Sequence, residues 1–195
     1  MKKILICGDS FAADWTTKYP GEGWPNLLAK EYDITNLAQA GCSEYKIYLQ
    51  LTSVDLTLYD NIVVSHTSPY RVYVKSHPVH RNDVLHQHSD LIYTDVKEHS
   101  KTVKGLDPII QYFEHYFDTD HAKFVHSLIC EKIDRLVSSY NALHITNLEW
   151  DDLYQFSNMV NFNQLFLTNR GLMNHYDSLG NQAIYEKVSE WIKSA

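Results

Sequence analysis

Short apolar runs alternate with amphipathic stretches along most of this chain, and this alternation restricts the fold more than any other feature. Four runs have the length and composition of strands: 2–8, 33–41, 60–67 and 142–150. Helical patterning predicts helices at 23–32, 44–54, 118–140 and from Gly180 to the C-terminal end. Because strands that alternate with helices form βαβ units, we expect an α/β fold whose parallel sheet has helices on both faces.

The helix predicted at 118–140 has the clearest local signals. Asp118 or Thr119 can cap its first turn, since both side chains carry an oxygen that accepts a backbone N–H. The apolar stripe that we expect to face the core contains Phe124, Leu128, Ile129, Ile133, Leu136 and Val137.

Residues 70–117 interrupt the alternation. This segment is rich in histidine and has no clear period, which predicts an insertion of loop and short helices. The rest of the chain contains no linker or repeat, and its length suits one compact core. We therefore expect a single domain over 1–195 with an insertion at about 70–117.

Charge and composition exclude several classes of partner. A net charge of −7 disfavours nucleic acid, because binding to phosphates needs a basic face. The apolar run Ile4 to Cys7 is too short for a signal peptide, and no stretch approaches the about 18 apolar residues that cross a bilayer. The 3 cysteines have no CxxC spacing, which favours a reducing compartment. We expect a cytoplasmic protein that binds neither nucleic acid nor membrane.

Side chains capable of nucleophilic chemistry lie at the ends of the predicted strands. Ser10 follows the first strand and His175 precedes the last helix, so a central first strand would bring them together. A serine hydroxyl becomes a nucleophile when a base takes its proton, and His175 is the candidate base. The backbone N–H groups of Ser10 and Gly41 are candidate donors to the oxyanion that would form.

These blocks resemble the SGNH (GDSL-type) hydrolase family. Its first block is matched by Gly8-Asp9-Ser10, its second by NLAQAGCS with Gly41, and its last by HYDSLGNQAIYEKV with His175 and Gly180. The resemblance implies a three-layer α/β/α sandwich with a flavodoxin-like parallel sheet of about five strands. It also implies Ser10 as nucleophile, His175 as base, and no cofactor.

The chain departs from the family after the third predicted strand. The family has a Gly-x-Asn-Asp block there, whose Asn donates to the oxyanion, whereas this chain reads SHTSPYR. Thr67 stands about where the Asn would be and can donate one hydrogen bond through a hydroxyl that rotates. His66 or Arg71 are the alternative donors.

The second departure concerns the acid of the catalytic triad. The family places it three residues before the histidine, and here that position is Leu172. Either His175 works in a dyad, oriented by a backbone carbonyl, or an acid comes from elsewhere. The candidate acids are Asp151, Asp152 and, less favoured, Asp177.

Two further groups flank the expected site. His66, Tyr70 and Arg71 are candidate rim residues that would contact a carboxylate, phosphate or sugar, or simply pack there. The tract with His77, His80, His86 and His88 has no nearby cysteine and no regular helical spacing, so we expect a polar lid and no metal.

The expected function is that of a serine esterase-type hydrolase that acts on a small-molecule or glycan ester. The 14 tyrosines and the polar insertion favour a carbohydrate O-acetyl or short-chain acyl ester over a lipid. One alternative is a non-catalytic relative that binds a ligand or glycan or takes part in assembly. A weaker alternative is an acyltransferase that uses the same Ser–His chemistry. The sequence leaves the oligomeric state open.

Overall fold

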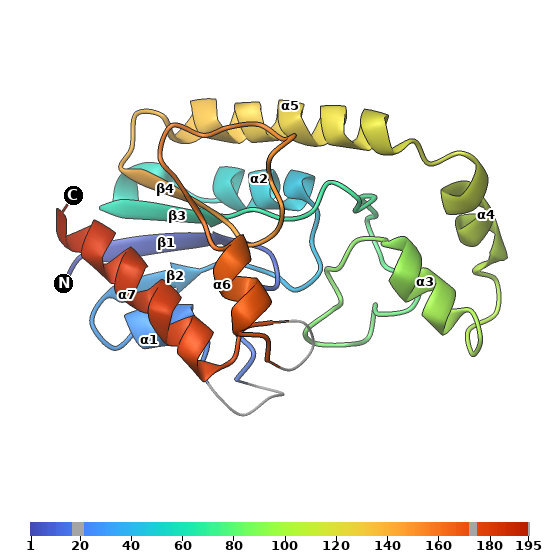
Figure 1. Ribbon diagram of the computed structural model, residues 1–195, viewed down its shortest axis with the longest axis horizontal. Helices are drawn as coiled ribbons and strands as arrows, with labels where there is room; N and C mark the ends of the chain where they lie inside the picture. The colour runs from blue at the N-terminus through green and yellow to red at the C-terminus, as the bar shows by residue number, and fades with distance from the viewer. Residues whose placement is uncertain (17–21, 172–174, 195) are drawn as a thin grey trace.

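The computed structural model describes residues 1–16, 22–171 and 175–194, and its centre is an all-parallel five-stranded sheet (Figure 1). The strand order is β2-β1-β3-β4-β5, so β1 lies between β2 and β3. The bounds of the strands are β1 Lys3–Gly8, β2 Asp33–Asn36, β3 Asn61–Ser65, β4 Ala142–Thr146 and β5 Met159–Asn161. This arrangement confirms the predicted three-layer α/β fold of flavodoxin-like type.

Both faces of the sheet are buried at its centre, and this explains why β1 is apolar from Ile4 to Cys7. In β1 the side chains of Ile4 and Ile6 pack on one face, whereas those of Leu5 and Cys7 pack on the other, and all four are fully buried. Successive side chains of a strand point to opposite faces, so every side chain is buried in a strand that is covered on both sides.

The helices form one layer on each face of the sheet. α1 (Trp24–Leu28) packs against α7 (Ser178–Ser194) in one layer, and α6 (Asn163–Thr168) belongs to the same core through Phe166. The other layer contains α2 (Glu44–Thr52), the short 3-10 helix η1 (Leu56–Leu58) and α5 (Thr119–Val137), which spans that face in Figure 1. No helix in the described part of the chain is long and apolar enough to span a membrane.

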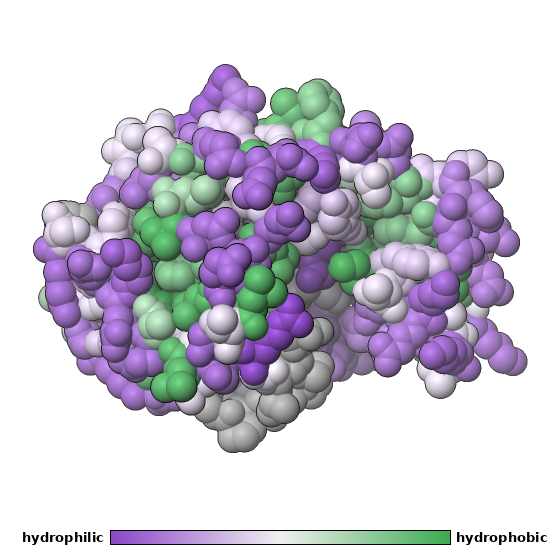
Figure 2. Space-filling model, in the orientation of Figure 1, coloured by the Kyte–Doolittle hydropathy of each residue, from purple (hydrophilic) through white to green (hydrophobic). Residues whose placement is uncertain are grey.

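The insertion projects from the carboxyl edge of the sheet. It contains α3 (Tyr93–His99) and α4 (Asp107–His115), which pack on each other around a small core with Leu91, Val96 and Leu106. Its outer surface is mostly hydrophilic, and an apolar patch lies in the angle between α4 and the start of α5 (Figure 2). The predicted loop-and-helix insertion therefore has a core of its own.

The stripe predicted for α5 is wrong in part. Phe124 and Leu128 are 62% and 48% exposed, and the buried residues of the helix are His126, Cys130, Ile133 and Val137. The reason is that His126 faces inward, where its Nε2 lies 2.9 Å from the backbone oxygen of Thr67 and donates to it. Asp118 is the cap, because its side chain accepts the amide of His121 at 2.8 Å.

Candidate functional site

The structure brings Ser10, Gly41 and His175 into one pocket at the carboxyl edge of the sheet. This Ser10 pocket has a volume of about 160 Å³ and is also lined by Arg71 and by residues of the insertion. The shared pocket follows from the topology: β1 is central, so its end lies beside the ends of β2 and β3. The segment that carries His175 arrives at the same edge, directly before α7.

Ser10 lies in a tight turn that follows β1. The carbonyl of Asp9 accepts the amides of Ala12 and Ala13, both at 3.1 Å, and the Asp9 carboxylate accepts the amide of Phe11 at 3.0 Å. Within the described residues, the amide and hydroxyl of Ser10 form no hydrogen bond. The turn thus leaves both groups available to a ligand.

His175 lines the Ser10 pocket in an aromatic setting. Its ring centroid is 4.6 Å from that of Trp15 and 5.3 Å from that of Phe11. Ser10 and His175 line the same pocket from different ends of the chain. Catalytic hydrogen bonds are often long without substrate, so shared occupancy of the pocket remains the relevant geometry.

Gly41 adopts a left-handed backbone conformation, which favours glycine. Its φ is +72°, and an added Cβ would lie 2.6 Å from Cβ of Ser89. Its carbonyl accepts from Arg71 Nη1 at 3.1 Å and from the amide of Asp90 at 2.9 Å. In the described part of the chain its own amide donates to no acceptor, like that of Ser10.

The side chain of Thr67 already forms hydrogen bonds within the protein. Its Oγ1 accepts from Arg71 Nε at 3.2 Å, and its hydroxyl donates to the Asp9 carboxylate. Burial raises the pKa of Asp9 to about 6, against the opposing effects of the Arg71 charge and of the Phe11 and Thr67 hydrogen bonds. Arg71, which Thr67 contacts, lines the Ser10 pocket, whereas Thr67 itself does not.

None of the three predicted acids lines the Ser10 pocket. Asp151 and Asp152 line a separate pocket with Tyr70, and Asp152 is paired with Lys123 at 3.5 Å. Asp177 caps α7, since its carboxylate accepts the amide of Gly180 at 2.8 Å. Leu172 lies outside the described residues.

The acids that do line the Ser10 pocket are Asp90 and Asp95, both from the insertion. Asp90 is buried and saturated: it accepts the amides of Ser43 and Val74 and pairs with Lys46 at 2.7 Å. The insertion had no periodic pattern that would have placed either residue, so reasoning from the sequence missed both.

His66 is not a rim residue, which corrects the sequence prediction. It is 1% exposed, and its ring nitrogens contact Glu44 Oε1 at 2.6 Å and His144 Nδ1 at 2.9 Å. His66 is buried beneath the site because it directly follows β3, whose residues are buried up to the last one. Tyr70 is 38% exposed and lies on the neighbouring pocket.

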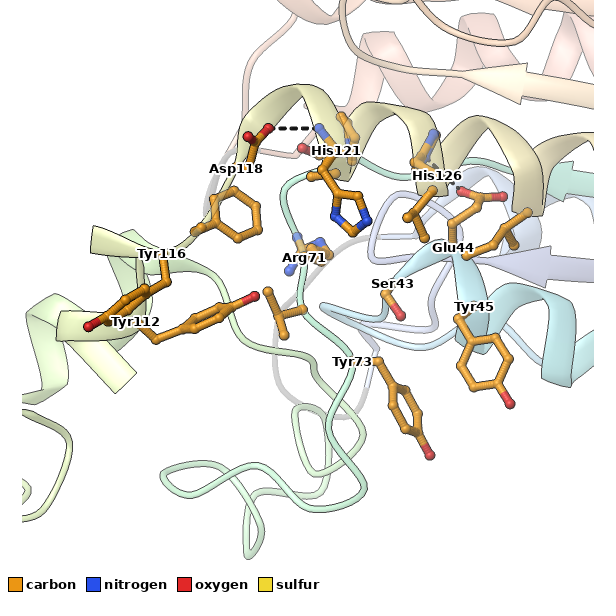
Figure 3. A pocket seen from close by; sticks show the side chains of 17 residues that line it. Ser43, Glu44, Tyr45, Arg71, Tyr73, Tyr112, Tyr116, Asp118, His121 and His126 are labelled. Atoms are coloured by element: carbon orange, nitrogen blue, oxygen red, sulfur yellow. Dashed lines mark hydrogen bonds and ion pairs between the residues drawn. The ribbon is translucent and has the colours of Figure 1, made fainter. Parts of the chain in front are cut away.

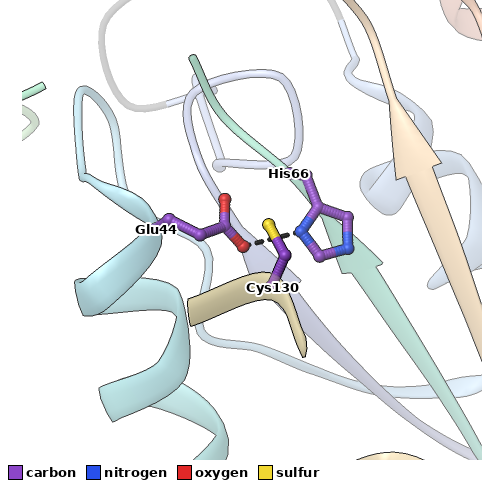
Figure 4. Close-up of side chains that lie close together, drawn as sticks. All are labelled: Glu44, His66 and Cys130. Carbon is purple, nitrogen blue, oxygen red and sulfur yellow. Dashed lines mark hydrogen bonds and ion pairs between the residues drawn. The ribbon is translucent and has the colours of Figure 1, made fainter. Parts of the chain in front are cut away.

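A buried polar network connects this layer to the site. Glu44 accepts from His66, from the amide of Thr67 at 3.2 Å and lies 3.3 Å from His126 Nε2, so it fastens the segment that carries Arg71. Cys130 completes the cluster drawn in Figure 4. Burial alone would raise the pKa of Glu44, but the His66 charge and the histidine hydrogen bonds outweigh it and hold the pKa well below its usual range.

The buried residues of this network are poorly suited to bind a metal or to act as nucleophiles. The 2.6 Å separation of His66 and Glu44 is a hydrogen bond, shorter than the roughly 3.3 Å between ligands of a tetrahedral metal with 2.0 Å bonds. Burial raises the pKa of the Cys130 thiol, and the side chain is fully buried. Burial and the neighbouring His66 lower the pKa of His144 to about 2, so this ring is neutral.

A second cluster gathers His77, His80 and Asp95 with ligand-type atoms within 4.8 Å of one another. His80 Nε2 lies 3.0 Å from the Asp95 carboxylate. His77 Nδ1 accepts the amides of Val79 and His80, both at 3.2 Å, so neutral His77 carries its proton on the Nε2 that faces Asp95. A metal would need that nitrogen unprotonated, so the cluster fits a polar lid better than a metal site.

Comparison with known proteins adds no relative. No protein-family model matches the sequence, and no curated protein matches it either.

Proposed function

We propose that the protein is a serine esterase-type hydrolase of the SGNH kind. The observation that supports this most is the Ser10 pocket, in which a serine and a histidine adjoin two backbone amides that have no acceptor among the described residues. Preorganised amides of this sort are what a tetrahedral oxyanion requires.

The reaction would proceed in two acyl transfers. Ser10 Oγ attacks the ester carbonyl carbon while His175 takes the hydroxyl proton, and the amides of Ser10 and Gly41 bind the oxyanion. The intermediate expels the alcohol, which receives the proton from His175, and leaves an acyl-serine. Water then attacks the acyl carbon and gives a proton to His175. The bond between the acyl carbon and Ser10 Oγ breaks, the acid is released, and His175 returns the proton to Ser10 Oγ.

Short acyl esters, including carbohydrate O-acetyl groups, are the substrates that we propose. The Ser10 pocket is small, at about 160 Å³, and its walls combine Trp15, Ala40 and Ile92 with the polar side chains of Arg71, His80 and Asp95. A long lipid chain would need an apolar channel instead. The three cysteines are free and buried, which supports a reducing, cytoplasmic setting.

Hydrolysis of p-nitrophenyl acetate at pH 8 tests the proposal, with fluorophosphonate labelling followed by mass spectrometry. We expect wild type to turn over, Ser10 to take the adduct, and both Ser10→Ala and His175→Ala to fall to background. Ser157→Ala is the matched control, since that serine is exposed and lines neither the Ser10 pocket nor the two pockets beside it. Acyl transfer to an added alcohol in excess of hydrolysis would point to an acyltransferase.

A non-catalytic binding protein is the second candidate. The observation that favours it is that none of the predicted acids Asp151, Asp152 and Asp177 lines the Ser10 pocket. It predicts an inert wild type, an unlabelled Ser10, and unchanged ligand affinity in Ser10→Ala.

A further inference from the structure

A larger pocket adjoins the Ser10 pocket, and Arg71 belongs to the walls of both. This tyrosine pocket has a volume of about 400 Å³, within the range of sites for small ligands. Its walls come from the start of α2, the segment after β3, α4 and the start of α5 (Figure 3). The insertion thus closes one side of it.

Arg71 presents unused hydrogen-bond donors there. A guanidinium has five N–H groups. Nε donates to Thr67 and Nη1 donates one hydrogen to the Gly41 carbonyl, which fixes the plane of the fork. The other Nη1 hydrogen and both on Nη2 have no acceptor in the described residues, and no carboxylate lies within ion-pair distance of Arg71 among them. These N–H groups of Nη1 and Nη2 can donate together to the two oxygens of a carboxylate.

Two partly exposed tyrosines on the walls of the pocket offer ring faces to a ligand. Tyr73 and Tyr112 are 44% and 42% exposed, and Tyr73 is braced by Tyr45, whose ring centroid is 5.0 Å away at a near-perpendicular angle. In Figure 3 Tyr112 extends from α4 toward Arg71. Exposed tyrosines held in place offer flat faces to aromatic rings and sugars.

Ser43 gives the pocket a buried polar group without a partner. The residue is 5% exposed, and its Oγ has no hydrogen-bond partner among the described residues although it lines the pocket. A buried hydroxyl that is left unsatisfied costs free energy, and a ligand oxygen would recover it. Ser43 and Arg71 line the same pocket (Figure 3).

We propose that the tyrosine pocket binds a ring that carries a carboxylate, as the part of the ester substrate that is not attacked. The carboxylate lies on the Arg71 fork, the ring lies against Tyr73 and Tyr112, and the ester reaches Ser10 on the other side of Arg71. Two carboxylates, Glu44 and Asp118, also line the walls, so a singly charged group is favoured over a phosphate monoester with nearly two charges. This inference rests on the proposed function for the identity of the ester.

Binding to the catalytically blocked Ser10→Ala protein tests the inference without any need for turnover. Calorimetric titrations would compare D-glucuronate and benzoate with the uncharged D-glucose and benzyl alcohol, and with inorganic phosphate. We expect at least one carboxylate to bind more than about tenfold more tightly than its uncharged counterpart, because a charge-assisted bidentate contact is lost in the latter. Preference for glucuronate identifies an acidic sugar, and preference for benzoate identifies an aromatic acid.

Variants locate the binding. In the Ser10→Ala background, Arg71→Gln should weaken carboxylate binding about 10- to 100-fold, whereas the control Arg81→Gln on the exposed insertion surface leaves it unchanged. Tyr73→Ala should weaken it about 3- to 10-fold, whereas Tyr70→Ala, a similarly exposed tyrosine on another pocket, should not. Melting temperatures show whether each variant is folded.

Three results overturn the inference: charged and uncharged probes that bind alike, inorganic phosphate that binds more tightly than either carboxylate, or no binding at millimolar concentration. Each can occur while wild type hydrolyses p-nitrophenyl acetate, so the proposed function would stand alone. Conversely, carboxylate binding in a protein without esterase activity would reject the hydrolase and keep the pocket.

Discussion

Replacing Asp9 by Asn should stabilise the protein at neutral pH and not at acidic pH. Asp9 is 1% exposed, and burial raises its pKa from 3.8 to about 6, even though Arg71, the Phe11 amide and the Thr67 hydroxyl oppose the rise. The folded protein therefore holds the proton more tightly than the unfolded chain does. Stability from this group is complete below pH 3.8 and is lost as the pH rises through about 6.

The size of the effect follows from the shift. A rise of about 2.2 pKa units corresponds to roughly 3 kcal/mol, and about 2 kcal/mol of that change falls between pH 4.5 and 7.5. Asn keeps the acceptor for the Phe11 amide and can donate to Thr67 Oγ1, so the change removes the ionisation and few hydrogen bonds. Arg71 loses a nearby negative charge, which reduces the gain.

Urea unfolding of wild type and Asp9→Asn at several pH values measures this directly. The difference in the free energy of unfolding between the two proteins should rise by up to about 2 kcal/mol in favour of Asn from pH 4.5 to 7.5. Asp33→Asn, at an exposed carboxylate, is the control and should show a flat difference. A flat or falling difference for Asp9→Asn would refute the assignment of a raised pKa.

Three further predictions concern the surroundings of the site. Glu44→Gln should destabilise the fold by about 3–5 kcal/mol in urea unfolding, because the histidines that it binds lose a buried counter-charge. The pKa of Glu44 is lower in the folded protein than in the unfolded chain, so its carboxylate stabilises the fold fully above the unfolded pKa. This stabilisation is lost as the pH falls through the folded pKa. The difference in the free energy of unfolding between wild type and Glu44→Gln should therefore become smaller in acid. Gly41→Ala should cost about 1–3 kcal/mol and reduce ester hydrolysis, as its Cβ would collide with Ser89; unchanged activity would argue against the Gly41 amide as donor. EDTA should leave the melting temperature unchanged, whereas a metal bound at 100 times its Kd would contribute about 2.7 kcal/mol that EDTA removes.

The central strands and the class of fold could be predicted because burial on both faces leaves a strong signal in the sequence. Ile4 to Cys7 of β1 and Ile62 to Val64 of β3 are apolar whichever way each side chain points. β5 could not be predicted: it has three residues, lies at the edge of the sheet and is only partly buried, so no pattern marks it. α6, with six residues, was missed for the same reason.

The site divides in a similar way. Ser10, Gly41 and His175 are tied to the ends of elements, and the topology of the sheet decides that they meet. The partners of Arg71 and the inward histidines depend on tertiary contacts instead. His126 is polar and stands outside the predicted apolar stripe, yet its contact with the Thr67 carbonyl turns that face of α5 inward. Its spacing of four residues from Cys130 was the one available signal.

The connection between β3 and β4 has a consequence for how easily this protein could change its ligand. The two strands are neighbours, yet residues 66–141 separate them, and the insertion at 70–117 accounts for most of that length. Closure entropy grows only with the logarithm of loop length, so the added segment raises the closure cost by about 0.9 kcal/mol. Natural variation in this segment can therefore remodel the wall of the tyrosine pocket while the strands that hold Ser10 keep their pairing.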